Sequence, residues 1–114
     1  MTAFTNITGA AGLKEGQTVF FLGIGGIGMS ALARYFNSRG HKVGGYDKTP
    51  SLLTKKLETE GMNIHYEDDL ALIDKEAALV VYTPAIPADH KELNYYKEQG
   101  YKLMKRSEVL GMIT

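Results

Sequence analysis

The stretch FLGIGGIGMSALARYFNSRGHKVGGYD, residues 21–47, indicates the fold of this chain. An apolar run leads into a glycine-rich turn, a helical segment follows, and a second apolar run ends in an acid, Asp47. This order is typical of a nucleotide-binding βαβ unit. The turn by itself does not choose among NAD, FAD and a sugar nucleotide, because each of them presents a diphosphate.

The composition of the chain fits a single soluble globular domain. It has 114 residues, of which 44% are hydrophobic and 23% are charged. The formal net charge is zero, so we expect neither a nucleic-acid nor a membrane partner. The absence of cysteine excludes disulfides, thiolate–metal sites and cysteine nucleophiles. No apolar run reaches the roughly 18 residues of a membrane span, and the first residues do not resemble a signal peptide, so we expect a cytoplasmic protein.

Repeated helix–glycine–strand units organise the chain. Gly40, Gly61 and Gly100 each follow a polar helical run and precede an apolar one, as helix C-caps do. Thr49 is the expected N-cap of the second helix, and Pro50 its first residue. The expected strands are residues 17–22, 42–47, 63–66, 78–82 and 102–105, and the expected helices are residues 28–39, 50–60, 90–99 and 107–112.

The alternation of strands and helices predicts an α/β fold. We expect a Rossmann-like, doubly wound, mainly parallel five-stranded sheet with helices on both faces. Residues 67–77 are expected to form a loop with at most one helical turn. Residues 1–16 are interpreted as an N-terminal extension, and residues 17–114 as the domain itself.

The glycines of the turn satisfy G-x-G-x-x-G in the order that the motif requires, after a strand and before a helix. Gly23 would allow the tight turn, Gly25 the approach of a diphosphate, and Gly28 close packing of the helix on the first strand. Unpaired N–H groups around residues 27–30 would then face the phosphate. The alternative interpretation is a tight turn without a ligand.

Two further segments are expected at the same crevice. Asp47 ends the second strand, about 20 residues after the glycines, where Rossmann domains place the acid that binds a ribose hydroxyl. A carboxylate there disfavours a 2′-phosphate; the alternative is a turn-forming acid. The fourth strand should lie beside the first, so residues 83–87 should line the crevice as well. The alternative is a rigid turn without ligand contact, because Pro84 and Pro87 restrict its path.

No catalytic arrangement or metal site is visible in the sequence. His41, His65 and His90 lack the spacing of metal ligands and are interpreted as strand-start or surface residues. Asp68 and Asp69 are interpreted as a solvated turn rather than an acid/base pair. The chain contains no G-x-x-x-x-G-K-[ST] phosphate loop. The sequence therefore predicts binding without catalytic residues of its own.

Three segments resemble the Mur ligase family. FLGIGGIGMSALA, residues 21–33, is similar to the family's opening, and within the family to the members that join L-alanine to UDP-N-acetylmuramate. VVYTPAIP, residues 80–87, is similar to its second loop, and RSEVL, residues 106–110, to its R-A-E-M-L element. Thr83-Pro84 departs from the serine-rich dipeptide of the family, so hydroxyl contacts there should differ. Ser107 and Val109 are conservative departures.

The resemblance implies that this chain is the first of three domains and binds the UDP part of UDP-N-acetylmuramate. The central domain of the family binds MgATP through a G-T-H-G-K-T-T loop, and the third positions the amino acid. The ligase activates the muramoyl carboxylate as an acyl phosphate, which L-alanine attacks. The chain ends about where the central domain should begin, so we expect no cofactor and no ligase activity in this domain alone, with the missing domains as partners. The residues implied to contact UDP are Gly23, Gly25, Gly26, Ile27, Gly28, Met29, Ser30, Asp47, Thr83, Pro84, Ala85 and Ile86.

Other functions stay open at this point. An NAD-binding domain of a dehydrogenase or sensor would share the glycine turn and the acid. A freestanding nucleotide-sensing module would require Thr114 to be the natural terminus. Within the family, the ligase that recycles murein tripeptides has the same N-terminal pattern. A phosphate loop downstream would support a ligase, and a substrate domain with a catalytic acid or base a dehydrogenase.

Overall fold

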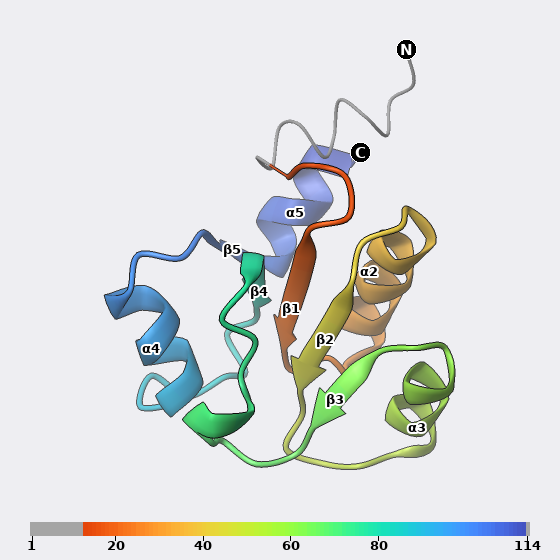
Figure 1. Cartoon of the computed structure of the whole chain (residues 1–114). Coiled ribbons are helices and arrows are strands. Elements are labelled where there is room, and N and C mark those ends of the chain that lie inside the picture. Colours follow the sequence, from red (N-terminus) through yellow and green to blue (C-terminus); the bar gives the residue numbers. More distant parts are fainter. Residues whose placement is uncertain (1–12, 114) are drawn as a thin grey trace.

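The computed structural model describes residues 13–113, which form a five-stranded parallel sheet with helices on both faces (Figure 1). The strands lie in the order β3-β2-β1-β4-β5, so the predicted Rossmann-like α/β fold is confirmed, with every strand pair parallel. The strands are β1 (Thr18–Leu22), β2 (Val43–Tyr46), β3 (Asn63–His65), β4 (Ala77–Tyr82) and β5 (Leu103–Lys105). The helices are α2 (Ile27–Ser38), α3 (Leu52–Thr59), α4 (Lys91–Glu98) and α5 (Arg106–Ile113), with a 3-10 turn η1 (Leu70–Leu72). Most of the predicted extension, residues 1–12, lies outside the described residues.

Strand β1 is at the centre of the sheet, and all five of its residues are buried. It pairs with β2 on one side and β4 on the other, and Leu22 is in register with both Tyr46 and Tyr82. The three strands therefore end at the same level. The residues that follow them must meet at one edge of the sheet.

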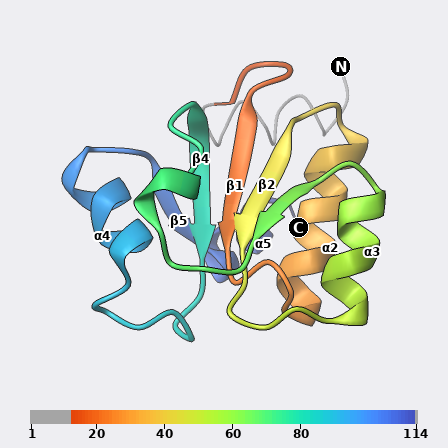
Figure 2. The same ribbon diagram turned by 60° about the horizontal axis from the view of Figure 1, so that its bottom comes forward.

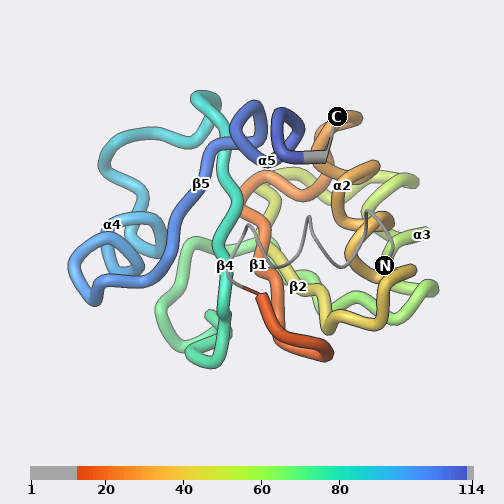
Figure 3. The backbone as a smooth tube through the Cα atoms, turned by 90° about the horizontal axis from the view of Figure 1, so that it is seen from above, coloured from red at the N-terminus to blue at the C-terminus, as the bar shows by residue number. Residues whose placement is uncertain are grey.

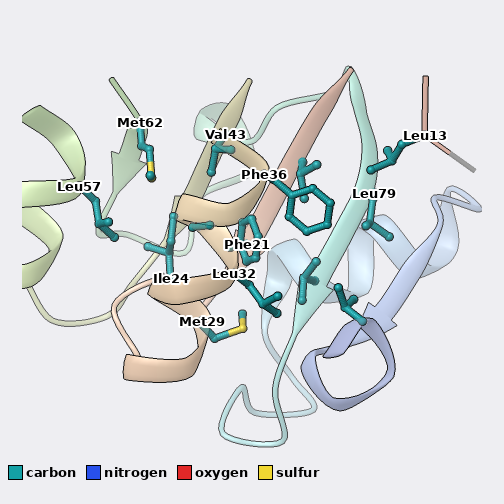
Figure 4. Packing of buried hydrophobic residues seen from close by; sticks show 14 residues of the cluster. Leu13, Phe21, Ile24, Met29, Leu32, Phe36, Val43, Leu57, Met62 and Leu79 are labelled. Atoms are coloured by element: carbon teal, nitrogen blue, oxygen red, sulfur yellow. The ribbon is translucent and has the colours of Figure 1, made fainter. Parts of the chain in front are cut away.

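The sheet separates two apolar cores. On one face α2, α3 and α5 cover Phe21, which packs with Phe36, Leu57 and Val109 among others (Figure 4). On the other face α4 covers Phe20. Figure 2 shows α2 and α3 together next to β2, with α4 beyond β4. Viewed from above, α5 lies on the same side of the strands as α2 (Figure 3). Three helices thus cover one face and a single helix the other.

The predicted start of α3 is wrong. Its N-cap is Ser51, not Thr49, and the helix begins at Leu52. The Ser51 hydroxyl accepts the Thr54 N–H at 3.1 Å, and the Thr54 hydroxyl accepts the Ser51 N–H at 2.9 Å. This reciprocal capping box satisfies two backbone donors at the N-terminus of the helix. The predicted glycine caps are confirmed: Gly40, Gly61 and Gly100 have φ of 87°, 100° and 77°.

Candidate functional site

A cleft of about 800 Å³ opens at the carboxyl ends of the central strands. Gly23 follows β1, Asp47 follows β2 and Thr83 follows β4, and all three line it. A groove of about 830 Å³ lies at the amino-terminal ends of β1 and β2, next to His41 and Lys42. Size therefore does not distinguish the two. We place the candidate site in the first, because open α/β sheets bind ligands outside the carboxyl ends of the strands. Its lining comprises Gly23, Gly26, Gly28, Met29, Tyr46, Asp47, Lys48, Asp68, Thr83, Ala85, Ile86, Pro87, Asp89, His90, Lys91 and Arg106.

The residues proposed from the sequence divide into two groups. Those that line the cleft are Gly23, Gly26, Gly28, Met29, Asp47, Thr83, Ala85 and Ile86. Those that do not are Gly25, Ile27, Ser30 and Pro84. The Ile27 side chain is 86% exposed. The Ser30 hydroxyl is buried and donates to the Ile27 carbonyl at 2.9 Å, so it already has a partner in its own helix.

Asp47 holds the glycine turn in place. Its Oδ2 accepts the Gly25 N–H at 2.7 Å, and its Oδ1 accepts the Thr49 N–H at 2.9 Å. A Cβ at position 25 would lie 2.6 Å from that Oδ2 and 2.8 Å from Thr54 Cγ2. Glycine is thus required there by the chain's own side chains, whatever the ligand. Each carboxylate oxygen keeps a lone pair with which it can accept a ribose hydroxyl.

The first turn of α2 supplies the donors for an anion. Its N-cap is Gly26, which has no side chain to cap the helix. The Gly26 N–H bonds to the Gly23 carbonyl at 3.2 Å, and the Ser30 N–H to the Gly26 carbonyl at 2.8 Å. The intervening N–H groups, those of Ile27, Gly28 and Met29, belong to the helix turn that has no intrahelical acceptor. Such groups, with the positive end of the helix dipole, bind phosphate.

Gly28 faces Arg106, not the first strand. A Cβ at this position would lie 2.7 Å from Arg106 Nη1 and 3.2 Å from its Cδ and Cζ. The nearest neighbour at Gly28 is therefore the side chain that begins α5, where close packing of α2 on β1 was expected. Arg106 adds a permanent positive charge beside the N-terminus of α2, and a guanidinium can bind phosphate oxygens through two parallel hydrogen bonds.

Arg106 begins the RSEVL segment, but the sequence pattern did not predict a role for it in binding. A topological signal was available, since the residue directly follows β5 and β5 is parallel to β4. Its backbone must therefore lie at the same edge of the sheet as Thr83. Tyr46, Lys48 and Lys91 also line the cleft without having been anticipated. Burial, followed by the charges of three nearby carboxylates, raises the pKa of the Tyr46 phenol, which keeps it neutral.

The histidine and acid-pair interpretations need correction. His90 is the buried N-cap of α4, and His65 ends β3, so neither is a surface or strand-start residue. His41 precedes β2 but is buried too, with Nδ1 2.9 Å from the Gln17 carbonyl. Asp68 lies outside the helices and strands, as expected, but it is only partly exposed. It accepts the N–H groups of the first two residues of α4, at 2.8 and 3.0 Å, because a helix N-terminus needs acceptors. Its neighbour Asp69 caps η1.

A largely buried hydrogen-bonded pair, Glu92 and His65, connects β3 to α4. Glu92 is fully buried, and its Oε2 lies 2.7 Å from His65 Nε2 and accepts the Asp69 N–H at 3.1 Å. The imidazole of His65 stacks on Phe20. This pair secures the segment that carries Asp68 against α4, and so shapes one wall of the cleft.

Between residues 13 and 113, no cluster of three or more His, Asp or Glu side chains is suited to a metal ion. Within the same residues, none of the helices combines the length and the apolar character that a membrane span requires.

The fold and the cleft define a nucleotide-binding α/β domain. The chain belongs to the Mur ligase family: the sequence profile described as "Mur ligase family, catalytic domain" matches residues 18–114. It is similar to UDP-N-acetylmuramate–L-alanine ligase of Cytophaga hutchinsonii, with 59% identity over 103 residues, which are 86% of this chain and 22% of that protein. The chain thus spans about a fifth of the length of this relative.

Two solved structures of ligases are similar to this domain. UDP-N-acetylmuramate–alanine ligase of Thermotoga maritima superposes with a TM-score of 0.78 at 29% identity, over 82% of this chain and 22% of that one. A murein peptide ligase of Psychrobacter arcticus superposes with a TM-score of 0.76 at 26% identity, over 83% of this chain and 20% of that one. The resemblance to the Mur ligases that the three sequence segments indicated is therefore confirmed.

Proposed function

We propose that this chain is the UDP-binding N-terminal domain of an ATP-dependent ligase that joins L-alanine to UDP-N-acetylmuramate in peptidoglycan synthesis. The observation that supports this most is the meeting of the uncapped α2 N-terminus with Arg106 at a cleft of nucleotide size. The similarity to a protein of that name supports the choice of nucleotide over NAD.

The roles follow from the chemistry along the cleft. The N–H groups of Ile27, Gly28 and Met29, with the guanidinium of Arg106, would bind the diphosphate. Asp47 would accept a ribose hydroxyl while it holds the glycine turn. The loop with Thr83, Pro84, Ala85 and Ile86 would contact the uridine side, as the resemblance implies. Gly23, Gly25, Gly26 and Ser30 would shape the turn rather than touch the ligand through side chains.

The domain would hold the substrate without reacting with it. MgATP and the amino acid would be bound by the rest of the ligase, and the acyl phosphate would form there. A ligase of this kind works in the cytoplasm, where ATP is available. This chain alone should release no phosphate from MgATP in the presence of UDP-N-acetylmuramate and L-alanine. Turnover above background would contradict the proposal that the chain is a binding domain only.

Binding should distinguish a uridine nucleotide from NAD. With one domain of three, we expect a Kd of roughly 10 μM to 1 mM. Ligand at ten times Kd should add about 1.4 kcal/mol of stability, a rise in Tm of about 5–10 °C. Thermal unfolding with UDP-N-acetylmuramate, UDP, NAD⁺ and NADP⁺ should show a shift with the first two, reduced in Asp47→Ala. A larger shift with NAD⁺ than with UDP would favour a dehydrogenase or sensor domain.

The murein peptide ligase of Psychrobacter arcticus supports a second candidate, a ligase that recycles murein tripeptides. Both ligases would use the same uridine site, so this domain does not discriminate between them. The full-length ligase should be assayed for ADP release with L-alanine and with the tripeptide. Faster turnover with the tripeptide would favour the second candidate.

A further inference from the structure

His90 holds a hydrogen-bond donor that the described part of the chain does not use. The residue is the N-cap of α4, is only 5% exposed, and lines the cleft, where its ring meets Tyr46 edge-on at 4.7 Å. Its Nδ1 accepts the Leu93 N–H at 3.3 Å. Because Nδ1 accepts this N–H, it carries no proton of its own, and the proton of the ring is on Nε2. Among residues 13–113, Nε2 has no hydrogen-bond partner.

Buried donors without a partner are rare in folded proteins and call for an explanation. Because His90 lines the cleft, an acceptor atom of a bound ligand would explain its unpartnered Nε2–H. A donor shielded from water also gives a stronger hydrogen bond than an exposed one. The side chains beside His90 on the same wall determine which edge of a ligand would fit there.

Asp68 is the neighbour, and it presents acceptors only. Its Oδ1 lies 3.5 Å from His90 Nδ1 and accepts the Glu92 N–H at 3.0 Å, while Oδ2 accepts the Lys91 N–H at 2.8 Å. The Asp68 side chain is 26% exposed and lines the cleft, so its remaining lone pairs are open to a ligand. The buried pair of Glu92 and His65 secures the segment before Asp68.

We propose that His90 and Asp68 read the base edge of the nucleotide and select uracil. This inference rests on the proposed binding of UDP. Uracil carries a carbonyl oxygen next to its N3–H, an acceptor beside a donor. His90 Nε2–H would donate to that oxygen, and the Asp68 carboxylate would accept N3–H. Cytosine has the reverse order, an amino group beside a bare ring nitrogen. Its amino group would meet the Nε2–H of His90, donor against donor, and its ring nitrogen would meet the Asp68 carboxylate, acceptor against acceptor.

The test is isothermal titration of the chain with UDP and with CDP, which share the ribose and the diphosphate. The wild type should bind UDP at least about tenfold more tightly than CDP, because mismatched polar groups at a buried edge lose their hydrogen bonds. His90→Asn is the informative variant. Asparagine is a good N-cap and keeps the bond to Leu93 N–H, but it removes Nε2–H. We expect about tenfold weaker UDP binding, little change for CDP, and loss of the preference.

Two further variants sharpen the result. Asp68→Asn replaces an acceptor with an amide that can also donate, so the ratio of UDP to CDP affinity should fall as well. His41→Asn is the matched control, since His41 is equally buried but lies at the amino-terminal ends of the strands. It should leave both affinities unchanged. Thermal unfolding of each variant confirms that the fold is retained.

The outcomes separate this inference from the proposed function. Equal affinity of the wild type for UDP and CDP, or an unchanged ratio in His90→Asn, would overturn the base-reading role while UDP binding stands. An equal loss of both nucleotides in His90→Asn would also overturn it and indicate a structural cap. If the wild type binds neither UDP nor UDP-N-acetylmuramate, the proposed function fails and this inference fails with it.

Discussion

Gly28→Ala should weaken the binding of UDP while leaving the stability of the fold nearly unchanged. The added Cβ would lie 2.7 Å from Arg106 Nη1 and 3.2 Å from Cδ and Cζ, so something must move. All three atoms belong to one long, flexible side chain, and the displacement should be taken up by Arg106 rather than by the backbone. Alanine is favoured over glycine in a helix by up to about 1 kcal/mol. We expect the free energy of unfolding to stay within about 1 kcal/mol of the wild type.

Affinity for UDP should fall in the same variant. The methyl group would push the guanidinium away from the diphosphate, removing a charge-assisted hydrogen bond that contributes about 1.5–3 kcal/mol. This corresponds to a Kd roughly 10- to 100-fold higher. The measurements are urea unfolding midpoints without ligand and isothermal titration with UDP. A stability loss well above 1 kcal/mol would refute the reasoning, since the backbone of β1 would then have to be the neighbour.

A double-mutant cycle tests the assigned cause. Arg106→Ala alone should weaken UDP binding, and adding Gly28→Ala to it should weaken binding little further, because the two changes act on one side chain. Additive losses would show that Gly28 acts independently of Arg106.

Gly25→Ala is the contrasting case, because it should lower stability. Its Cβ would meet the side chains of Asp47 and Thr54 at 2.6 and 2.8 Å, and both side chains are held by other hydrogen bonds, so stability should fall by about 1–3 kcal/mol.

Three further variants test the fold. Gly45→Ala should destabilise the chain by about 1–3 kcal/mol or prevent folding, because its Cβ would lie 2.5 Å from the Phe21 carbonyl oxygen in the neighbouring strand. Ser51→Ala should cost about 1 kcal/mol through loss of the α3 cap. Burial raises the pKa of Tyr96, so the unfolded chain ionises first, and stability should decline as pH rises above about 10, the ordinary phenol value. Tyr96→Phe should make that decline shallower, while costing about 1 kcal/mol at neutral pH for the lost bond to the Asp74 carbonyl.

Gly45→Ala and Tyr96→Phe each have a control within the chain. Gly40→Asn should be far milder than Gly45→Ala, because a Cβ at position 40 meets nothing within 4 Å and asparagine tolerates positive φ. Tyr35→Phe should cost nothing at neutral pH, since its buried hydroxyl has no hydrogen-bond partner in the described part of the chain. Urea unfolding at pH 8 to 11 compares the tyrosine variants. Parallel curves for wild type and Tyr96→Phe would contradict the assignment.

The fold could be predicted from the sequence because its signals are local. Apolar runs mark the strands, and Gly40, Gly61 and Gly100 end helices through a backbone conformation that other residues rarely adopt. The general position of the cleft followed too, because parallel strands bring Gly23, Asp47 and Thr83 to one edge. The predicted start of α3 was wrong, because the side chain of Ser51, not that of Thr49, makes the capping hydrogen bond.

The composition of the site depended on tertiary packing. Arg106, Asp68 and His90 reach the cleft from three segments far apart in the sequence, and no local pattern states which side chains will converge. The same is true of the glycines. A motif predicts where glycine stands, but the atoms that exclude a side chain at Gly25 and Gly28 come from Asp47, Thr54 and Arg106. These contacts are set by how β2, α3 and α5 pack against the turn, so only the folded chain determines them.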